Sequence, residues 1–93
     1  MLINHDAFDE TYEEMQQRVV RAFDKIRTEA RGNVLVVSHG DPIAALLNHV
    51  VEREVGKNYY VLHPDTGSLS IVECTDIPRL VLFNFRRRLF ENY

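Results

Sequence analysis

An apolar run that breaks at a histidine and resumes at once constrains the fold more than any other feature of this sequence. The run is residues 34–47, VLVVSHGDPIAALL. Residues 34–37 are apolar, mostly β-branched and without polar alternation, which predicts a strand covered on both faces. Asp41 and Pro42 then predict a helix, with Asp41 as its N-cap and Pro42 as its first residue. A buried strand leading into a helix is typical of layered α/β folds.

A longer helix is predicted before this junction. Apolar residues recur at spacings of three and four across residues 8–30, which indicates one apolar helix face. Thr11 and Glu14 have the spacing of a capping box, so we expect the helix to begin there. Gly32 is the expected C′ residue at its other end.

The remaining chain returns to strand character. We expect the second helix to end near Arg53 and residues 57–67 to form one short helical turn and a loop. Residues 68–73 alternate in polarity and residues 80–83 are apolar, with a turn sequence at 75–78, which predicts an antiparallel hairpin. The predicted fold class is therefore α/β, in the order helix, strand, helix, strand, strand.

Length and composition narrow the functional classes. The 93 residues suffice for one domain, which we assign to residues 1–93. A net charge of −3 gives no overall field that would attract nucleic acid or a membrane surface. One cysteine, Cys74, allows no internal disulfide, no Cys/His spacing suits zinc, and the N-terminus has no signal-peptide pattern. We therefore expect a cytoplasmic protein without a metal site, a nucleic-acid partner or a membrane partner.

His39 is the candidate functional residue. It lies at the carboxyl end of the predicted buried strand, where open α/β sheets bind ligands. Gly40 lets a ligand or another backbone come close, and the helix start offers free N–H groups to an anion such as phosphate. The structural alternative is that His39 only bonds to neighbouring backbone in a tight turn. The junction alone leaves both interpretations open.

Several motifs in the right order resemble one family. The segments are 34–43, which holds Ser38-His39-Gly40, the helix opening at 10–18, and residues 65–73. Together they resemble the C-terminal half of the histidine phosphatase superfamily, the phosphoglycerate mutase-like proteins. Residues 1–93 would then be the C-terminal part of such a domain, a layered half of the phosphoglycerate mutase-like fold.

The resemblance implies a role for His39 and Gly40 in binding a phosphorylated small molecule or phosphate. His39 matches the family's second histidine, which stabilises the phosphoryl oxygens during transfer. The nucleophilic histidine of the family belongs to an Arg-His-Gly motif, and these 93 residues contain none. The other histidines, His5, His49 and His63, match no catalytic motif. The family's chemistry proceeds through a phosphohistidine, without metal or organic cofactor.

We therefore expect this chain alone to be a poor catalyst, because phosphoryl transfer needs several positive groups around the transferring oxygens. The resemblance also implies that the missing half supplies the central strand beside residues 34–37. An unpaired apolar edge favours association, either with an N-terminal half-domain on another polypeptide or with itself. Two functions remain open: part of a histidine phosphatase or phosphoglycerate mutase acting on phosphomonoesters, or a non-catalytic truncated relative that acts as an assembly or regulatory module.

Overall fold

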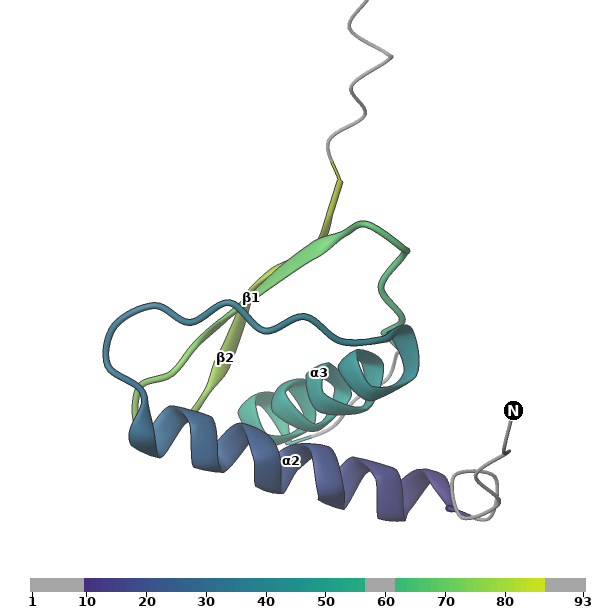
Figure 1. Cartoon of the computed structure of the whole chain (residues 1–93), viewed down its shortest axis with the longest axis horizontal. Helices are drawn as coiled ribbons and strands as arrows, with labels where there is room; N and C mark the ends of the chain where they lie inside the picture. Colours follow the sequence, from purple (N-terminus) through teal and green to yellow (C-terminus); the bar gives the residue numbers. More distant parts are fainter. Residues whose placement is uncertain (1–9, 57–61, 87–93) are drawn as a thin grey trace, which may run out of the picture.

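Two helices and a two-stranded sheet form the part of the chain that the computed structural model describes, residues 10–56 and 62–86 (Figure 1). The elements in chain order are α2 (Tyr12–Glu29), α3 (Gly40–Val55), β1 (Leu69–Glu73) and β2 (Arg79–Phe85). The predicted α/β class is confirmed, in the observed order helix, helix, strand, strand. The predicted short helical turn falls partly on residues 57–61, outside the described residues, and residues 62–68 form a loop with a turn.

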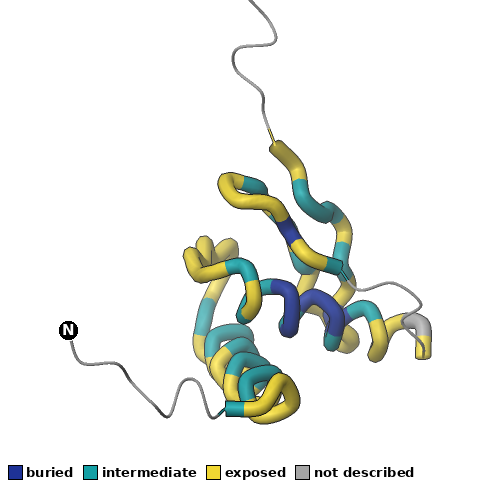
Figure 2. The backbone as a smooth tube through the Cα atoms, turned by 90° about the vertical axis from the view of Figure 1, so that its right-hand side faces the viewer, coloured by how far each residue is buried: buried dark blue, intermediate teal, exposed yellow. Residues whose placement is uncertain are grey.

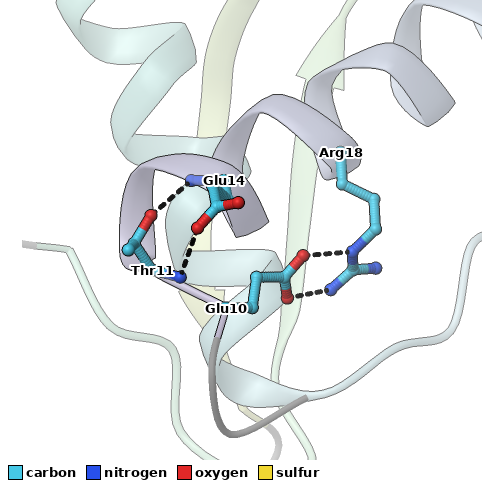
Figure 3. Close-up of polar contacts among 4 residues, drawn as sticks. All are labelled: Glu10, Thr11, Glu14 and Arg18. Atoms are coloured by element: carbon cyan, nitrogen blue, oxygen red, sulfur yellow. Dashed lines mark hydrogen bonds and ion pairs between the residues drawn. The ribbon is translucent and has the colours of Figure 1, made fainter. Parts of the chain in front are cut away.

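The start of α2 confirms the predicted capping box (Figure 3). The Thr11 hydroxyl accepts from the Glu14 N–H at 3.1 Å, and the Glu14 carboxylate accepts from the Thr11 N–H at 3.1 Å. Arg18 donates two hydrogen bonds to Glu10, at 3.0 and 3.1 Å, across the same first turns. The hydrogen bond from the Arg18 guanidinium lowers the pKa of the Glu10 carboxyl. The two capping-box hydrogen bonds therefore satisfy the N–H groups of Thr11 and Glu14, which have no partner within the helix.

The other end of α2 differs from the prediction. The C-cap is Ala30, whose N–H donates to the Ile26 carbonyl at 2.8 Å and whose backbone is extended. Gly32 has a positive φ of 75° but lies two residues beyond this cap, so its assignment as C′ was wrong. The left-handed glycine turns the chain after the helix has already ended.

The start of α3 lies before the predicted one. His39 is the N-cap and Gly40 the first helical residue, so the prediction of Asp41 as the N-cap was wrong. Pro42 is the third helical residue and is tolerated there because every position in the first turn has an N–H without a helical partner. A proline thus marks the first turn of a helix without fixing its first residue. The helix continues to Val55, past the predicted end, and stops at Gly56, which has a φ of 79°.

The core of the protein is centred on α3. Four apolar residues and one amide of this helix are buried: Ala44, Ala45, Leu47, Val50 and Asn48 (Figure 2). α2 packs on one side of α3 and β2 contacts α3 as well. Gln16 of α2 donates to the carbonyl of the fully buried Ala45 at 2.9 Å, where the small side chain lets the two helices approach closely.

β1 and β2 form the predicted antiparallel hairpin. Glu73 lies opposite Arg79, and their side chains form an ion pair at 3.3 Å. The register shifts on either side of Ile71, and Asn84 near the end of β2 has a left-handed φ of 60°. The outer side of the hairpin leaves four large apolar side chains 43–54% exposed: Leu69, Ile71, Val81 and Phe85.

The strand predicted at residues 34–37 is absent, and this prediction was wrong. No hydrogen bond joins the backbone of this segment to another described residue, and in Figure 1 it runs as an irregular trace between α2 and α3. A strand exists only where a neighbour pairs with its N–H and C=O groups, and within residues 10–56 and 62–86 β1 pairs only with β2. The composition of residues 34–37 therefore favours a strand, but no described strand pairs with this segment.

Among the described residues, no helix is both long and apolar enough to cross a membrane.

Candidate functional site

His39 lies where the irregular segment meets α3. Its backbone is extended, with φ −110° and ψ 165°, and its carbonyl accepts the first helical hydrogen bond from the Ile43 N–H at 3.0 Å. Its side chain is exposed and makes no capping hydrogen bond. The interpretation in which His39 only bonds to neighbouring backbone in a turn therefore has no side-chain bond to support it. The imidazole is available to solvent beside the free N–H groups of the helix start.

Gly40 is close to a second histidine that the sequence did not single out. A Cβ placed on Gly40 would lie 3.1 Å from Cε1 and 3.5 Å from Nε2 of His63. The glycine therefore makes room for the His63 ring, and its φ is not in the left-handed region. Close approach by another group was predicted at Gly40, and the group observed there is a side chain of the same chain.

His63 also contacts the carboxylate at the start of α3. Its Nε2 lies 3.2 Å from Oδ1 of Asp41, and both side chains are more than half exposed. The Asp41 carboxylate is favoured near the positive end of the helix dipole but repels an incoming anion. The start of α3 thus brings together His39, Asp41 and His63.

Asn48 holds the segment that carries His63. Its side-chain amide donates to the Leu62 carbonyl at 2.8 Å, and its carbonyl accepts from the Leu62 N–H at 2.9 Å. Asn48 is 7% exposed and also donates to the Ala44 carbonyl at 2.7 Å. Because Leu62 directly precedes His63, this two-way clamp fixes the backbone from which the second histidine extends.

The loop beyond His63 is fixed by Asp65. The Asp65 N–H donates to the Asn84 side chain at 2.7 Å, and the Asn84 amide donates to the Asp65 carboxylate at 3.0 Å. Arg86 forms an ion pair with the same carboxylate at 3.4 Å. The hydrogen bond from Asn84, with smaller effects of Arg86 and His63, lowers the pKa of the Asp65 carboxyl. The loop between α3 and β1 is therefore held at Leu62 and at Asp65, on both sides of His63.

His49 lies away from this cluster. It is half-buried on α3 and lines two shallow depressions between α2 and α3, one with Arg27 and Arg53 and the other with Gln17 and Arg21. The remaining histidine, His5, lies outside the described residues. Within residues 10–56 and 62–86, no group of three His, Cys, Asp or Glu side chains is arranged to hold a metal ion.

Comparison with protein-family models identifies the chain. The model of the histidine phosphatase superfamily (branch 1) matches residues 3–85. The chain therefore belongs to the histidine phosphatase superfamily, as its motifs indicated. Comparison with curated proteins gave no match, and comparison with solved structures gave none either.

The arrangement at the start of α3 has the chemistry of a partial anion site. One exposed imidazole and a helix N-terminus can donate to oxyanion oxygens, and the second imidazole is already directed at a carboxylate. Sequence reasoning found His39 but missed His63, which lies 22 positions from Asp41. No local pattern signals this contact. The only sequence hint is Gly40, whose missing side chain leaves space for another group.

Proposed function

We propose that this chain supplies the phosphoryl-stabilising part of a histidine phosphatase or phosphoglycerate mutase site that acts on phosphomonoesters. His39 binds phosphoryl oxygens through its imidazole, and the N–H groups of Gly40 and Asp41 add donors from the helix start. The observation that carries the proposal is the exposed His39 side chain, which caps nothing and stands at the first turn of a 16-residue helix. Membership of the superfamily supports the same role.

The nucleophile comes from elsewhere in this proposal. Phosphohistidine formation requires an imidazole nitrogen to attack phosphorus while the P–O bond to the alcohol breaks, and the alcohol oxygen leaves with the bonding electrons and takes up a proton. In hydrolysis, a water oxygen then attacks phosphorus, the P–N bond breaks, and inorganic phosphate and the free imidazole are released. The 93 residues contain no Arg-His-Gly motif. An N-terminal half-domain that carries this motif would provide the attacking histidine and arginines, with His39 stabilising the charge on the transferring oxygens.

Binding and turnover are tested separately. Inorganic phosphate is titrated into the isotope-labelled chain, and we expect the amide resonances of Gly40 and Asp41 to shift. His39→Ala should abolish the shifts, whereas the control His49→Ala, which alters the same helix away from the cluster, should retain them. Asp41→Asn should strengthen binding because it removes a negative charge from the site. Equal binding by the parent and His39→Ala would refute the role of His39.

Turnover of a generic aryl phosphate is measured for the parent and for His39→Ala. We expect neither protein to hydrolyse it, because one histidine and a helix start supply only part of the required stabilisation. Activity that is present in the parent and lost in His39→Ala would mean that the 93 residues contain a nucleophile, and the proposed division of the site would be wrong.

A non-catalytic role as an assembly or regulatory module is the second candidate. The exposed apolar residues 34–37 favour it, because such a segment is suited to association. The coding sequence upstream of or adjacent to this chain separates the two candidates. An Arg-His-Gly motif encoded there supports the enzyme, and its absence supports the module.

A further inference from the structure

Residues 34–37 combine two features that a strand partner would remove together. Their side chains are strongly exposed: Val34 51%, Leu35 79%, Val36 59% and Val37 85%. Their backbone has no hydrogen bond to any residue of the described ranges. Pairing with another strand would satisfy the backbone groups and withdraw apolar surface from water at the same time.

The segment has none of the features that prevent edges from pairing. Proteins protect free strand edges with charged residues, proline or bulges. Residues 33–38 contain no charge and no proline. The nearest charged residues on the two sides are Arg31 and Asp41, which have opposite signs and are both exposed. A segment that is uncharged in the middle and oppositely charged at its two flanks is complementary to an antiparallel copy of itself.

We infer that the chain forms a two-fold dimer in which residues 34–38 of two copies pair antiparallel, with Val36 opposite Val36. Two-fold antiparallel pairing requires one residue to face its own copy. With Val36 at the centre, Leu35 faces Val37, and the flank that carries Arg31 lies toward the flank of the second copy that carries Asp41. Both charges lie outside the paired segment, because Gly32 turns the chain and α3 begins at Gly40. The flanking charges therefore favour the antiparallel arrangement, and the register centred on Val36 is part of the proposal.

This dimer does not complete a phosphate site. The two copies of His39 are each three positions from the axis, on opposite sides, which separates them by about 20 Å along the strands. The inference concerns assembly and depends on no part of the proposed phosphate chemistry. If phosphate does not bind at His39, the dimer inference still stands. If the chain is monomeric, the phosphate proposal still stands.

The dimer is expected to be weak and concentration-dependent. A strand pair of this length buries much less than the roughly 1,600 Å² of a standard stable interface. Light scattering coupled to size exclusion, or sedimentation equilibrium, should show the dimer fraction increasing between about 1 μM and about 1 mM. A chain that remains monomeric at the upper concentration refutes the inference. Open-ended growth of larger assemblies refutes the closed two-fold arrangement.

A matched pair of substitutions locates the interface. Val36→Lys places two like charges opposite each other and should raise the dissociation constant by at least about tenfold. The control Val81→Lys removes a valine of similar exposure, 48%, from the outer side of the hairpin and should leave dimerisation unchanged. Val36 is exposed, so the circular dichroism spectrum should not change. Loss of the dimer in Val81→Lys but not in Val36→Lys would place the interface on the hairpin and refute the inference.

Disulfide trapping tests the register. In a Cys74→Ser background, Val36→Cys places two thiols on directly opposite residues, whose Cα atoms lie about 4.5–5.5 Å apart, within disulfide reach. Val34→Cys places them about 13 Å apart, beyond that reach. Mild oxidation should cross-link Val36→Cys only. Preferential cross-linking of Val34→Cys would refute this register.

The flanking charges provide an independent check. Arg31→Glu should weaken the dimer, and addition of Asp41→Arg to the same chain should restore it, because the pair is rebuilt with reversed signs. If the double variant is weaker than Arg31→Glu alone, these two flanks do not attract each other across the interface and the antiparallel arrangement is wrong.

Discussion

The Asn48 clamp is expected to contribute a large part of the stability of the fold. Asn48→Ala removes the two hydrogen bonds to the Leu62 backbone, at 2.8 and 2.9 Å. The Ala44 carbonyl keeps its helical partner, so it is not counted as a loss. Each lost bond to a partly buried backbone group is worth about 0.5–1.5 kcal/mol, which gives a destabilisation of about 1–3 kcal/mol. That is a substantial fraction of the stability of a small domain.

Urea unfolding followed by circular dichroism measures this loss, with all variants at one protein concentration because any dimer stabilises the folded state. With a urea dependence of about 1–3 kcal/mol/M, the midpoint should fall by about 1 M at an unchanged slope. His49→Ala is the control, since it truncates the next residue, which is half-buried. His49→Ala should lower the urea midpoint clearly less than Asn48→Ala does.

The same substitution reports on the candidate site. Release of Leu62 frees the backbone of His63, so the His63 ring resonances should move toward those of a free histidine as its contact with Asp41 at 3.2 Å is lost. Destabilisation below about 0.5 kcal/mol at unchanged slope, within the range of a neutral surface substitution, would refute the reasoning. It would mean that water or other groups satisfy Leu62 as well as Asn48 does.

Three further outcomes are expected. Thr11→Ala should lower the free energy of unfolding by about 1 kcal/mol, because the Glu14 N–H loses its cap; a urea midpoint equal to that of the parent would contradict this. Gly40→Ala should displace the His63 ring, whose Cε1 would lie 3.1 Å from the new Cβ, and unchanged His63 ring resonances would contradict this. The pKa of Asp65 is lowered from its ordinary value of 3.8 in the folded state, so its contribution is present above that pH and is lost as pH falls through the folded pKa. Asp65→Asn should therefore flatten the decline of the urea midpoint below pH 3.8, and identical declines in the two proteins would contradict this.

Local features of the fold were predictable from the sequence. The capping box depends on residues three positions apart, so the Thr11 and Glu14 pattern was sufficient to place the start of α2. The hairpin depends on one segment of alternating polarity, one apolar segment and the turn between them. The start of α3 was misplaced because Asp41 and Pro42 are acceptable anywhere in a first turn, and only the backbone conformation of His39 identifies the cap.

Features that depend on distant residues were not predictable. Residues 34–37 have the composition of a buried strand, but a strand requires a neighbour, and sequence patterns do not show whether one is present. The contact of His63 with Asp41 spans 22 positions and arises because Asn48 holds Leu62 against α3. The sequence placed His39 at the end of an apolar segment and the start of a helix. The charged groups around it, His63 and Asp41, are brought together only in the folded chain.

Residues 34–37 connect the assembly to the candidate site. Ser38 and His39 continue directly from Val37, and the segment has no hydrogen bond that fixes it within the described chain. Pairing of this segment with any strand, from a second copy or from an N-terminal half-domain, would order the backbone that leads into His39. If order at His39 favours phosphate binding, then linkage requires phosphate to strengthen the pairing by the same factor. We therefore expect occupation of the unpaired segment to change how well His39 is positioned beside His63 and Asp41.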